Sequence, residues 1–148
     1  MSIDLQELAG RYRDILRQAV YLTRSMDAEG ELSTRHVSTL NMVSTGPMRV
    51  SAIASYAGVR VPSATEQVIK LEAAGLVERI PDATDARAVL VRLTPKGREA
   101  LDSANGRRNA TMAAALETLS REERQIIAGA IPAIAKLNAA VAAQPATA

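Results

Sequence analysis

The chain has no cysteine, no tryptophan and no phenylalanine, and three tyrosines are its only aromatic residues apart from a single histidine. Without cysteine, disulfides, thiolate metal sites, cysteine nucleophiles and thiol redox switches are excluded. A metal site would have to consist mostly of carboxylates, which argues against a metal-sensing protein. The absence of phenylalanine and tryptophan also disfavours a large aromatic cage. We therefore expect no cofactor and no metal.

The sequence also lacks the features of an exported or membrane protein. Charged residues are spread through its first twenty positions, which leaves no signal-peptide core. No apolar run approaches the roughly 18 residues that a membrane span needs. At 148 residues, of which 47% are hydrophobic, the chain can form one compact domain. A cytoplasmic location follows as an expectation.

Net charge is only +2, but the positive charge is unevenly distributed. Over residues 49–98, eight basic residues outnumber five acidic ones. This central excess favours contact with a polyanion such as nucleic acid, although an ordinary solvated surface would have the same composition.

Both ends of the chain have helical periodicity. Apolar residues recur at spacings of three and four from Ile3 to about Ser25. A polar link at residues 27–31 follows, and Ser33 can cap a second helix that Thr45-Gly46-Pro47 would end near Ser44. Near the C-terminus, the regular spacing of apolar residues resumes at Ala100. The narrow apolar stripe of the first helix is typical of helix pairing.

The last helix is expected to begin at a capping box formed by Ser120 and Glu123. Pro132 should kink this helix, and the tail from Gln144 to Ala148 should fray. The terminal helices carry more apolar surface than a small core absorbs. They predict a homodimer, although packing on each other within one chain would also cover them.

Residues 49–76 predict a helix-turn-helix. Ile53 and Ala54 lie on a short helix, Gly58 supplies the turn, and Pro62 suits the first turn of a second helix that ends at Gly75. Five polar residues of the second helix are expected to face away from its apolar stripe: Ser63, Thr65, Glu66, Gln67 and Lys70. Those near its N-terminus are short polar groups that could read base edges in a major groove. A helical hairpin with a solvated outer face is the alternative.

Two β-prone runs, residues 76–80 and 88–93, then predict a hairpin, so that residues 81–87 form its loop. A hairpin directly after a helix-turn-helix is a wing. Asp82 and Asp85 can hold the loop backbone and aim the guanidinium of Arg87 into a minor groove. An ordinary surface hairpin remains an alternative. Catalysis is disfavoured, because no histidine, cysteine or glycine-rich phosphate loop accompanies the two carboxylates.

The segment GLVERIPDATDARAVLVRLTPKG, residues 75–97, resembles the wing signature of the MarR family of winged-helix bacterial regulators. The matching positions are Arg79, Asp82, Asp85 with Arg87, and Leu93-Thr94 with Gly97. Thr94 should also cap a new helix that has Pro95 at its first position. The resemblance extends over nearly the whole chain.

The resemblance implies a mainly α fold with a small two-stranded β-wing. It implies a single domain over residues 1–148, with a winged helix-turn-helix at 32–98 and dimerisation helices at 1–31 and 99–148. The homodimer would bind a pseudo-palindrome in double-stranded DNA, and Arg87 would enter a minor groove. The predicted DNA-binding residues are Arg49, Arg60, Pro62, Ser63, Thr65, Glu66, Gln67, Lys70, Asp85 and Arg87.

Glu66 departs from the family pattern, because many relatives carry a DNA-contacting arginine there. Its carboxylate would repel phosphate unless it accepts from a cytosine amino group or pairs with a base such as Lys70. Lys70 and Arg49 are expected to contact phosphates. Glu66 is the best support for an alternative function, a winged-helix dimer that acts as a protein-interaction or ligand-binding module without DNA.

Family members often bind small amphipathic or phenolic anions between the dimer helices and the winged region. The candidate effector contacts are Tyr12, Arg13, Arg17, Tyr21, His36 and Met42. Core tyrosines and a structural histidine are the ordinary explanations of the same residues. The favoured function is a non-enzymatic DNA-binding regulator, a repressor released by such a ligand.

Overall fold

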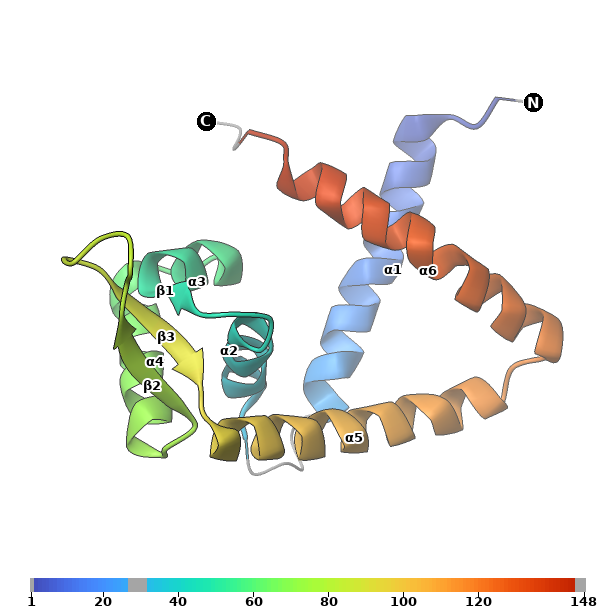
Figure 1. Cartoon of the computed structure of the whole chain (residues 1–148). Coiled ribbons are helices and arrows are strands. Elements are labelled where there is room, and N and C mark those ends of the chain that lie inside the picture. Colours follow the sequence, from blue (N-terminus) through green and yellow to red (C-terminus); the bar gives the residue numbers. More distant parts are fainter. Residues whose placement is uncertain (1, 27–31, 146–148) are drawn as a thin grey trace. The chain divides into compact units, whose positions relative to one another are not determined.

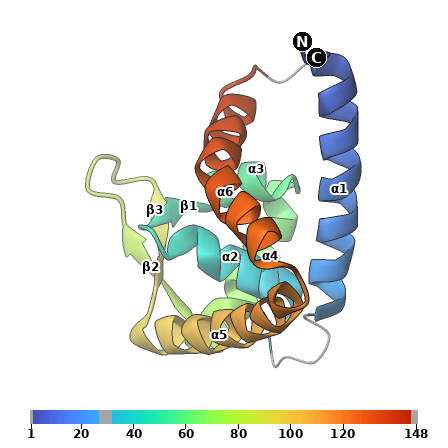
Figure 2. The ribbon, with the colours of Figure 1, turned by 90° about the vertical axis from the view of Figure 1, so that its right-hand side faces the viewer.

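The computed structural model describes residues 2–26 and 32–145, which form six helices and three short strands (Figures 1 and 2). In chain order the elements are α1 (Leu5–Met26), α2 (Thr34–Val43), β1 (Met48–Arg49), α3 (Val50–Ala57), α4 (Val61–Ala73), β2 (Val77–Pro81), β3 (Val89–Leu93), α5 (Pro95–Glu117) and α6 (Arg121–Ala142). The polar link predicted at 27–31 and the last three residues of the tail lie outside the described residues.

The predicted caps define three helix starts. Ser33 caps α2 by accepting a hydrogen bond from the His36 amide. At α6, Ser120 and Glu123 exchange the two hydrogen bonds of a capping box. The Thr94 hydroxyl accepts from the Gly97 amide at 3.0 Å, with Pro95 as the first residue of α5. These short polar side chains satisfy amides that a helix start leaves without partners, which is why the sequence located them well.

Helices α3 and α4 form the predicted helix-turn-helix. Gly58 ends α3 in the left-handed conformation, with φ of 65°, and its amide bonds back to α3 carbonyls. Pro62 lies in the first turn of α4, where a missing amide hydrogen costs nothing. Ala54 is buried, so the two helices have a small residue on their packed side. Gly75 follows α4 with φ of 74° and turns the chain into β2.

The predicted hairpin is present, but the sheet has a third strand that the sequence did not reveal. Strands β2 and β3 pair antiparallel, with Val77 opposite Leu93 and Pro81 opposite Val89. The two residues of β1 pair with the other edge of β3, Arg49 opposite Leu90, so the strand order is β1-β3-β2. A two-residue strand is too short to have a visible alternation. Figure 1 shows the β2–β3 loop extending beyond the sheet.

One hydrophobic core supports the helix-turn-helix and the sheet. Its largest fully buried side chains include Leu40 of α2, Ile53 of α3, Leu71 of α4, Val91 of β3 and Leu101 of α5. Helices α2, α3 and α4 each present an apolar stripe to this core, and the first turns of α5 add Leu101 and Ala104. The core therefore fixes α4 and the hairpin relative to each other.

The junction between the hairpin and α5 explains the Leu-Thr-x-x-Gly part of the wing signature. The Thr94 hydroxyl donates to the Gly75 carbonyl at 2.6 Å, while the Lys96 ammonium donates to the Ala74 carbonyl at 2.9 Å. Gly97 is buried against the same turn, and a Cβ there would lie 1.9 Å from the Leu76 carbonyl oxygen. Only glycine permits this approach of α5 to the end of α4.

The chain divides into two compact units, residues 1–108 and 109–148, with the boundary inside α5. In the first unit, α1 has no buried residue and exposes Leu5, Ile15, Val20 and Leu22. In the second, α6 continues through Pro132 to Ala142, also without a buried residue. By length and composition alone, α6 is the one described helix that could cross a membrane.

Candidate nucleic-acid interface

Helix α4 has one buried face and one exposed face. Ala64, Val68 and Leu71 are buried in the core. Pro62, Ser63, Glu66 and Lys70 are exposed, as the sequence predicted, and Arg60 is exposed at the N-cap immediately before the helix. The exposed N-terminal half thus carries short polar groups and the positive end of the helix dipole, a combination suited to a polyanion.

Gln67 and Thr65 do not face away from the protein as predicted. Gln67 is half-buried, and its carboxamide oxygen accepts a 3.0 Å hydrogen bond from the hydroxyl of the buried Thr39 on α2. Thr65 is also half-buried, and its hydroxyl donates to the Val61 carbonyl at 2.9 Å. A buried hydroxyl requires a partner, and α2 lies close enough to supply Gln67 with one. Gln67 therefore links α4 to α2.

Glu66 has the partner that its sequence context suggested. Its carboxylate lies 3.2 Å from the Lys70 ammonium one turn later, and both side chains are mostly exposed. An exposed pair of this spacing stabilises a helix by only about 0.3–0.5 kcal/mol, so either group can readily exchange its partner for DNA.

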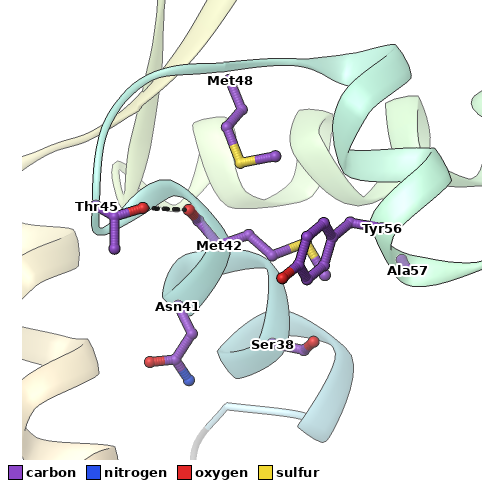
Figure 3. Close-up of a pocket in the computed structure, with 7 residues that line it drawn as sticks. All are labelled: Ser38, Asn41, Met42, Thr45, Met48, Tyr56 and Ala57. Carbon is purple, nitrogen blue, oxygen red and sulfur yellow. Dashed lines mark hydrogen bonds between the residues drawn. The ribbon is translucent and has the colours of Figure 1, made fainter. Parts of the chain in front are cut away.

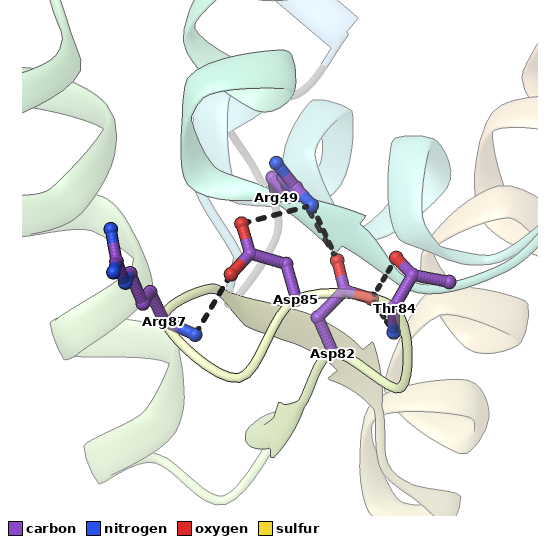
Figure 4. Close-up of polar contacts among 5 residues, drawn as sticks. All are labelled: Arg49, Asp82, Thr84, Asp85 and Arg87. Carbon is purple, nitrogen blue, oxygen red and sulfur yellow. Dashed lines mark hydrogen bonds and ion pairs between the residues drawn. The ribbon is translucent and has the colours of Figure 1, made fainter.

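Asp82 organises the base of the wing loop. One carboxylate oxygen accepts from the Thr84 amide at 2.9 Å and from the Thr84 hydroxyl at 2.8 Å. The other accepts two hydrogen bonds from the Arg49 guanidinium, at 2.7 and 3.1 Å (Figure 4). The Thr84 amide, followed by Arg49, lowers the pKa of Asp82 to about 2. Asp82 therefore remains ionised at neutral pH.

Asp85 holds the tip of the loop through the backbone. Its carboxylate accepts from the Arg87 amide at 3.0 Å and lies 4.0 Å from the Arg49 guanidinium. The expected aiming of the Arg87 guanidinium by a carboxylate is absent. Figure 4 shows that side chain pointing away from both aspartates, and it has no hydrogen bond or ion pair with the described residues. Arg87 is exposed and available to a ligand.

Of the six candidate effector contacts, only Met42 lines a described pocket. This pocket of about 610 Å³ lies between α2, β1 and α3 (Figure 3), and its lining is Ser38, Asn41, Met42, Thr45, Met48, Tyr56 and Ala57. Sequence reasoning missed Tyr56, whose ring lies beside the Met42 side chain although the two residues belong to different helices. No charged side chain belongs to the lining.

The other five candidates lie outside this lining. Arg13, Arg17 and Tyr21 are exposed on α1, and Arg17 pairs with Asp14. Tyr12 is half-buried, and its hydroxyl is shielded from solvent without a hydrogen-bond partner among the described residues. His36 is half-buried on α2. Burial, and to a smaller extent the charge of Lys70, lowers the pKa of His36, so the imidazole is neutral at physiological pH.

Within the described residues, no group of three or more histidine or acidic side chains is placed to hold a metal ion. The polar groups that the fold brings together are instead the exposed half of α4 and the wing loop. Both project from one packed unit, an arrangement suited to binding an extended polyanion.

Comparison with known proteins agrees with this geometry. A model of the MarR family matches residues 36–89. The HTH-type transcriptional regulator Mb0904 of Mycobacterium bovis is 32% identical over 121 residues, which cover 79% of this chain and 85% of the relative. The structure of the transcriptional regulator BldR from Sulfolobus solfataricus superposes with a TM-score of 0.65 at 29% identity, covering 88% of this chain and 94% of BldR.

A second similar structure is that of Streptococcus pneumoniae FabT in complex with DNA. Its TM-score is 0.64 at 18% identity, over 93% of this chain and 99% of FabT, a likeness that concerns the fold. Together, the packed helix-turn-helix with its hairpin and the similarity to Mb0904 show that the chain belongs to the MarR family of winged helix-turn-helix transcriptional regulators, which are DNA-binding proteins rather than enzymes.

Proposed function

We propose that the protein binds a pseudo-palindromic operator as a homodimer and represses transcription until a small molecule releases it. In each subunit, α4 enters a major groove and the wing loop reaches the adjacent minor groove. The observation that carries this proposal is the pairing of an exposed polar half of α4 with an exposed Arg87, both fixed to one core. Chromosomal DNA as the target implies a cytoplasmic location.

The division of labour follows from chemistry. Ser63 and Glu66, near the N-terminus of α4, are short enough to contact base edges in a major groove. Arg60 and Lys70 flank them and are suited to phosphate contacts, which give affinity without sequence information. The planar Arg87 guanidinium favours the strong negative potential of a narrow, A·T-rich minor groove.

Dimerisation would explain the uncovered terminal helices. On α1 and α6, exposed apolar residues such as Leu5 (77% exposed) and Ile126 (70% exposed) recur at helical spacing. Burying these faces between two chains would supply a stable interface on the order of 2,000 Å². A helix-turn-helix dimer generally reads two half-sites about one turn of DNA apart, so we expect the operator to repeat its half-site at that spacing.

The pocket favours an uncharged effector. Its lining combines two methionine side chains and one tyrosine ring with the polar groups of Ser38, Asn41 and Thr45, and it lacks a cation to neutralise an acid. Its volume of about 610 Å³ is within the usual range for small ligands. The phenolic anions suggested by the sequence would therefore bind less well than neutral aromatic molecules of similar size. Tyr56→Ala should lose the response to such a ligand while retaining DNA binding.

A titration by fluorescence anisotropy tests DNA binding. The purified full chain is added to the labelled region upstream of its own gene and to a shuffled duplex of the same composition. We expect the upstream region to bind at least about 10³-fold more tightly at physiological salt, as specific sites generally do. Equal, weak binding of both duplexes would contradict sequence-specific recognition.

Glu66 supports the second candidate function, a dimer that binds a protein or ligand instead of DNA, because it adds negative charge to the centre of the exposed face of α4. No binding to either duplex at low salt would favour that function. If Glu66 accepts from cytosine, Glu66→Gln should change the preferred base at one position of each half-site, as selection from a random DNA pool would reveal.

A further inference from the structure

The backbone of Arg49 lies at the start of the helix-turn-helix, whereas its side chain contacts the wing loop. It ends β1, where it pairs with Leu90 of β3, and it is also the N-cap residue of α3. Its side chain makes no cap hydrogen bond to α3. The guanidinium instead extends to the loop between β2 and β3, 33 positions further along the chain, as Figure 4 shows.

That guanidinium contacts both of the carboxylates that organise the loop. Two of its nitrogens donate to the same oxygen of Asp82, at 2.7 and 3.1 Å, and one nitrogen lies 4.0 Å from Asp85. Asp82 in turn binds Thr84, while Asp85 binds the amide of Arg87. A continuous series of polar contacts thus connects the start of α3 with the backbone of Arg87.

We propose that Arg49 is a positioning residue for DNA binding, which orients the wing loop and Arg87 relative to the helix-turn-helix, rather than a phosphate contact. This inference rests on the proposed function. The side chain of Asp82 is only 10% exposed, against 46% for that of Arg49. Moving Arg49 onto a phosphate would leave a largely covered carboxylate without its cation, beside the DNA. The hydrogen bond to Asp82 raises the pKa of Arg49, so the guanidinium is charged throughout the accessible pH range.

The two possible roles of Arg49 predict opposite changes in DNA affinity for the substitution Asp82→Asn. If Arg49 contacts phosphate, Asp82→Asn frees it, removes an anion and tightens DNA binding. If Arg49 positions the wing, Asp82→Asn weakens DNA binding. The asparagine side chain could still accept the hydrogen bonds from Thr84, but Arg49 would lose its ionic partner. Arg49→Lys also discriminates, since lysine retains the charge but cannot reproduce the two-nitrogen contact.

Binding cycles with Arg87 test the positioning role directly. Arg49→Ala should weaken operator binding by about five- to tenfold in the wild-type background, a typical coupling between residues of one hydrogen-bond network, and by less than about twofold in Arg87→Ala. In the Arg87→Ala background, Arg49→Ala should leave the salt dependence of binding unchanged. A fall of about 0.9 in the salt slope, with additive losses in the double variant, would identify a phosphate contact and overturn the proposal.

Loop order can be measured without DNA. Because the chain has no cysteine, Ala86→Cys gives one site per chain for a nitroxide label at the exposed loop tip. We expect Arg49→Ala and Asp82→Asn each to raise the mobility of the label, measured by electron paramagnetic resonance. Arg92→Ala is the matched control, because its side chain is 50% exposed and pairs with Glu78 across the strands instead of with the loop.

The outcomes separate the two proposals. Unchanged label mobility in both Arg49→Ala and Asp82→Asn, or an equal rise in Arg92→Ala, would overturn the positioning role whatever the protein binds. Increased mobility in a protein that binds no DNA would confirm the contact with the loop but reject the proposed function. If Arg49→Ala does not fold, Asp82→Asn alone provides the sign of the affinity change and the label mobility.

Discussion

The winged region and the terminal helices differ in whether their apolar residues are buried. All the buried hydrophobic side chains of the described residues lie between Val37 and Ala104, in α2–α4, the turn after α4, the sheet and the start of α5. Helices α1 and α6 are as regular as the others but have no buried residue. The winged region therefore contains its own stabilising core, whereas the terminal helices expose their apolar faces.

The largest expected effect is the loss of the dimer through a charge on the apolar face of α6. Ile134→Glu would have to bury a carboxylate if this face pairs with a second chain, whereas Gln125→Glu places the same charge on the opposite side of the helix. We expect Ile134→Glu to sediment as a monomer and to bind the operator at least about 100-fold more weakly, while Gln125→Glu resembles the wild type.

The winged region should remain folded in the monomer, because its core lies within one chain. A cooperative unfolding transition in monomeric Ile134→Glu would show that the core is independent of dimerisation. If the wild type itself sediments as a folded 15.7 kDa monomer at micromolar concentration, the interpretation of the terminal helices is wrong.

The next largest effect concerns the core, and two glycines of α5 provide the test. A Cβ at Gly97 would meet the Leu76 carbonyl oxygen at 1.9 Å and a Leu93 methyl at 2.8 Å, whereas a Cβ at Gly106 meets nothing within 4 Å. Gly97→Ala should lower the free energy of unfolding by about 3 kcal/mol through overpacking. Gly106→Ala should raise it by about 0.5–1 kcal/mol through helix propensity. Urea denaturation measures both, and equal changes would contradict the tight junction.

The third effect concerns Arg87, which should contribute to DNA binding but not to stability. Arg87→Ala should weaken operator binding by about 1–3 kcal/mol, comparable to the loss of a good base contact. Its thermal midpoint should stay nearly unchanged, because the side chain is exposed and makes no described contact. A folded, dimeric Arg87→Ala protein with wild-type affinity would contradict the role of the wing.

Sequence reasoning succeeded where the determinant is local. Ser33, Ser120 and Thr94 located helix starts, and Gly58 located the turn, because caps and positive φ angles depend on neighbouring residues. The hairpin was predicted to within one residue at each strand end, from Leu76 instead of Val77 and from Ala88 instead of Val89.

What the sequence could not predict depends on distant partners. Gln67 faces inward because Thr39, 28 residues earlier, needs an acceptor. The hydrogen bond from Arg49 to Asp82 was not predicted, because Asp82 lies 33 positions further along the chain. The pocket joins Met42 to Tyr56 across two helices, so neither helix alone indicates it. Spacing along one element does not contain such contacts, since tertiary packing decides them.

The smallest expected effect is a loss of stability at low pH that comes from Asp82 in the wing loop. The pKa of Asp82 falls from its ordinary value of 3.8 to about 2, first through the Thr84 amide and then through Arg49. Between these values the unfolded chain binds more protons than the folded one, so the contribution of Asp82 is complete above about pH 3.8 and is lost as the pH falls through 2.

Asp82→Asn removes the titrating group but preserves the shape of the side chain. The excess stability of the wild type over Asp82→Asn should therefore be constant near neutrality and shrink as the pH falls from about 4 to 2. His36 titrates in a separate window: its lowered pKa means that acidification below its ordinary value of 6.5 destabilises the fold. Thermal midpoints of the wild type, Asp82→Asn and His36→Gln across this range separate the two contributions. A difference between wild type and Asp82→Asn that persists undiminished at pH 2 would mean that it does not come from the charge of Asp82, and the ionic link from Arg49 to the wing would then contribute nothing to stability.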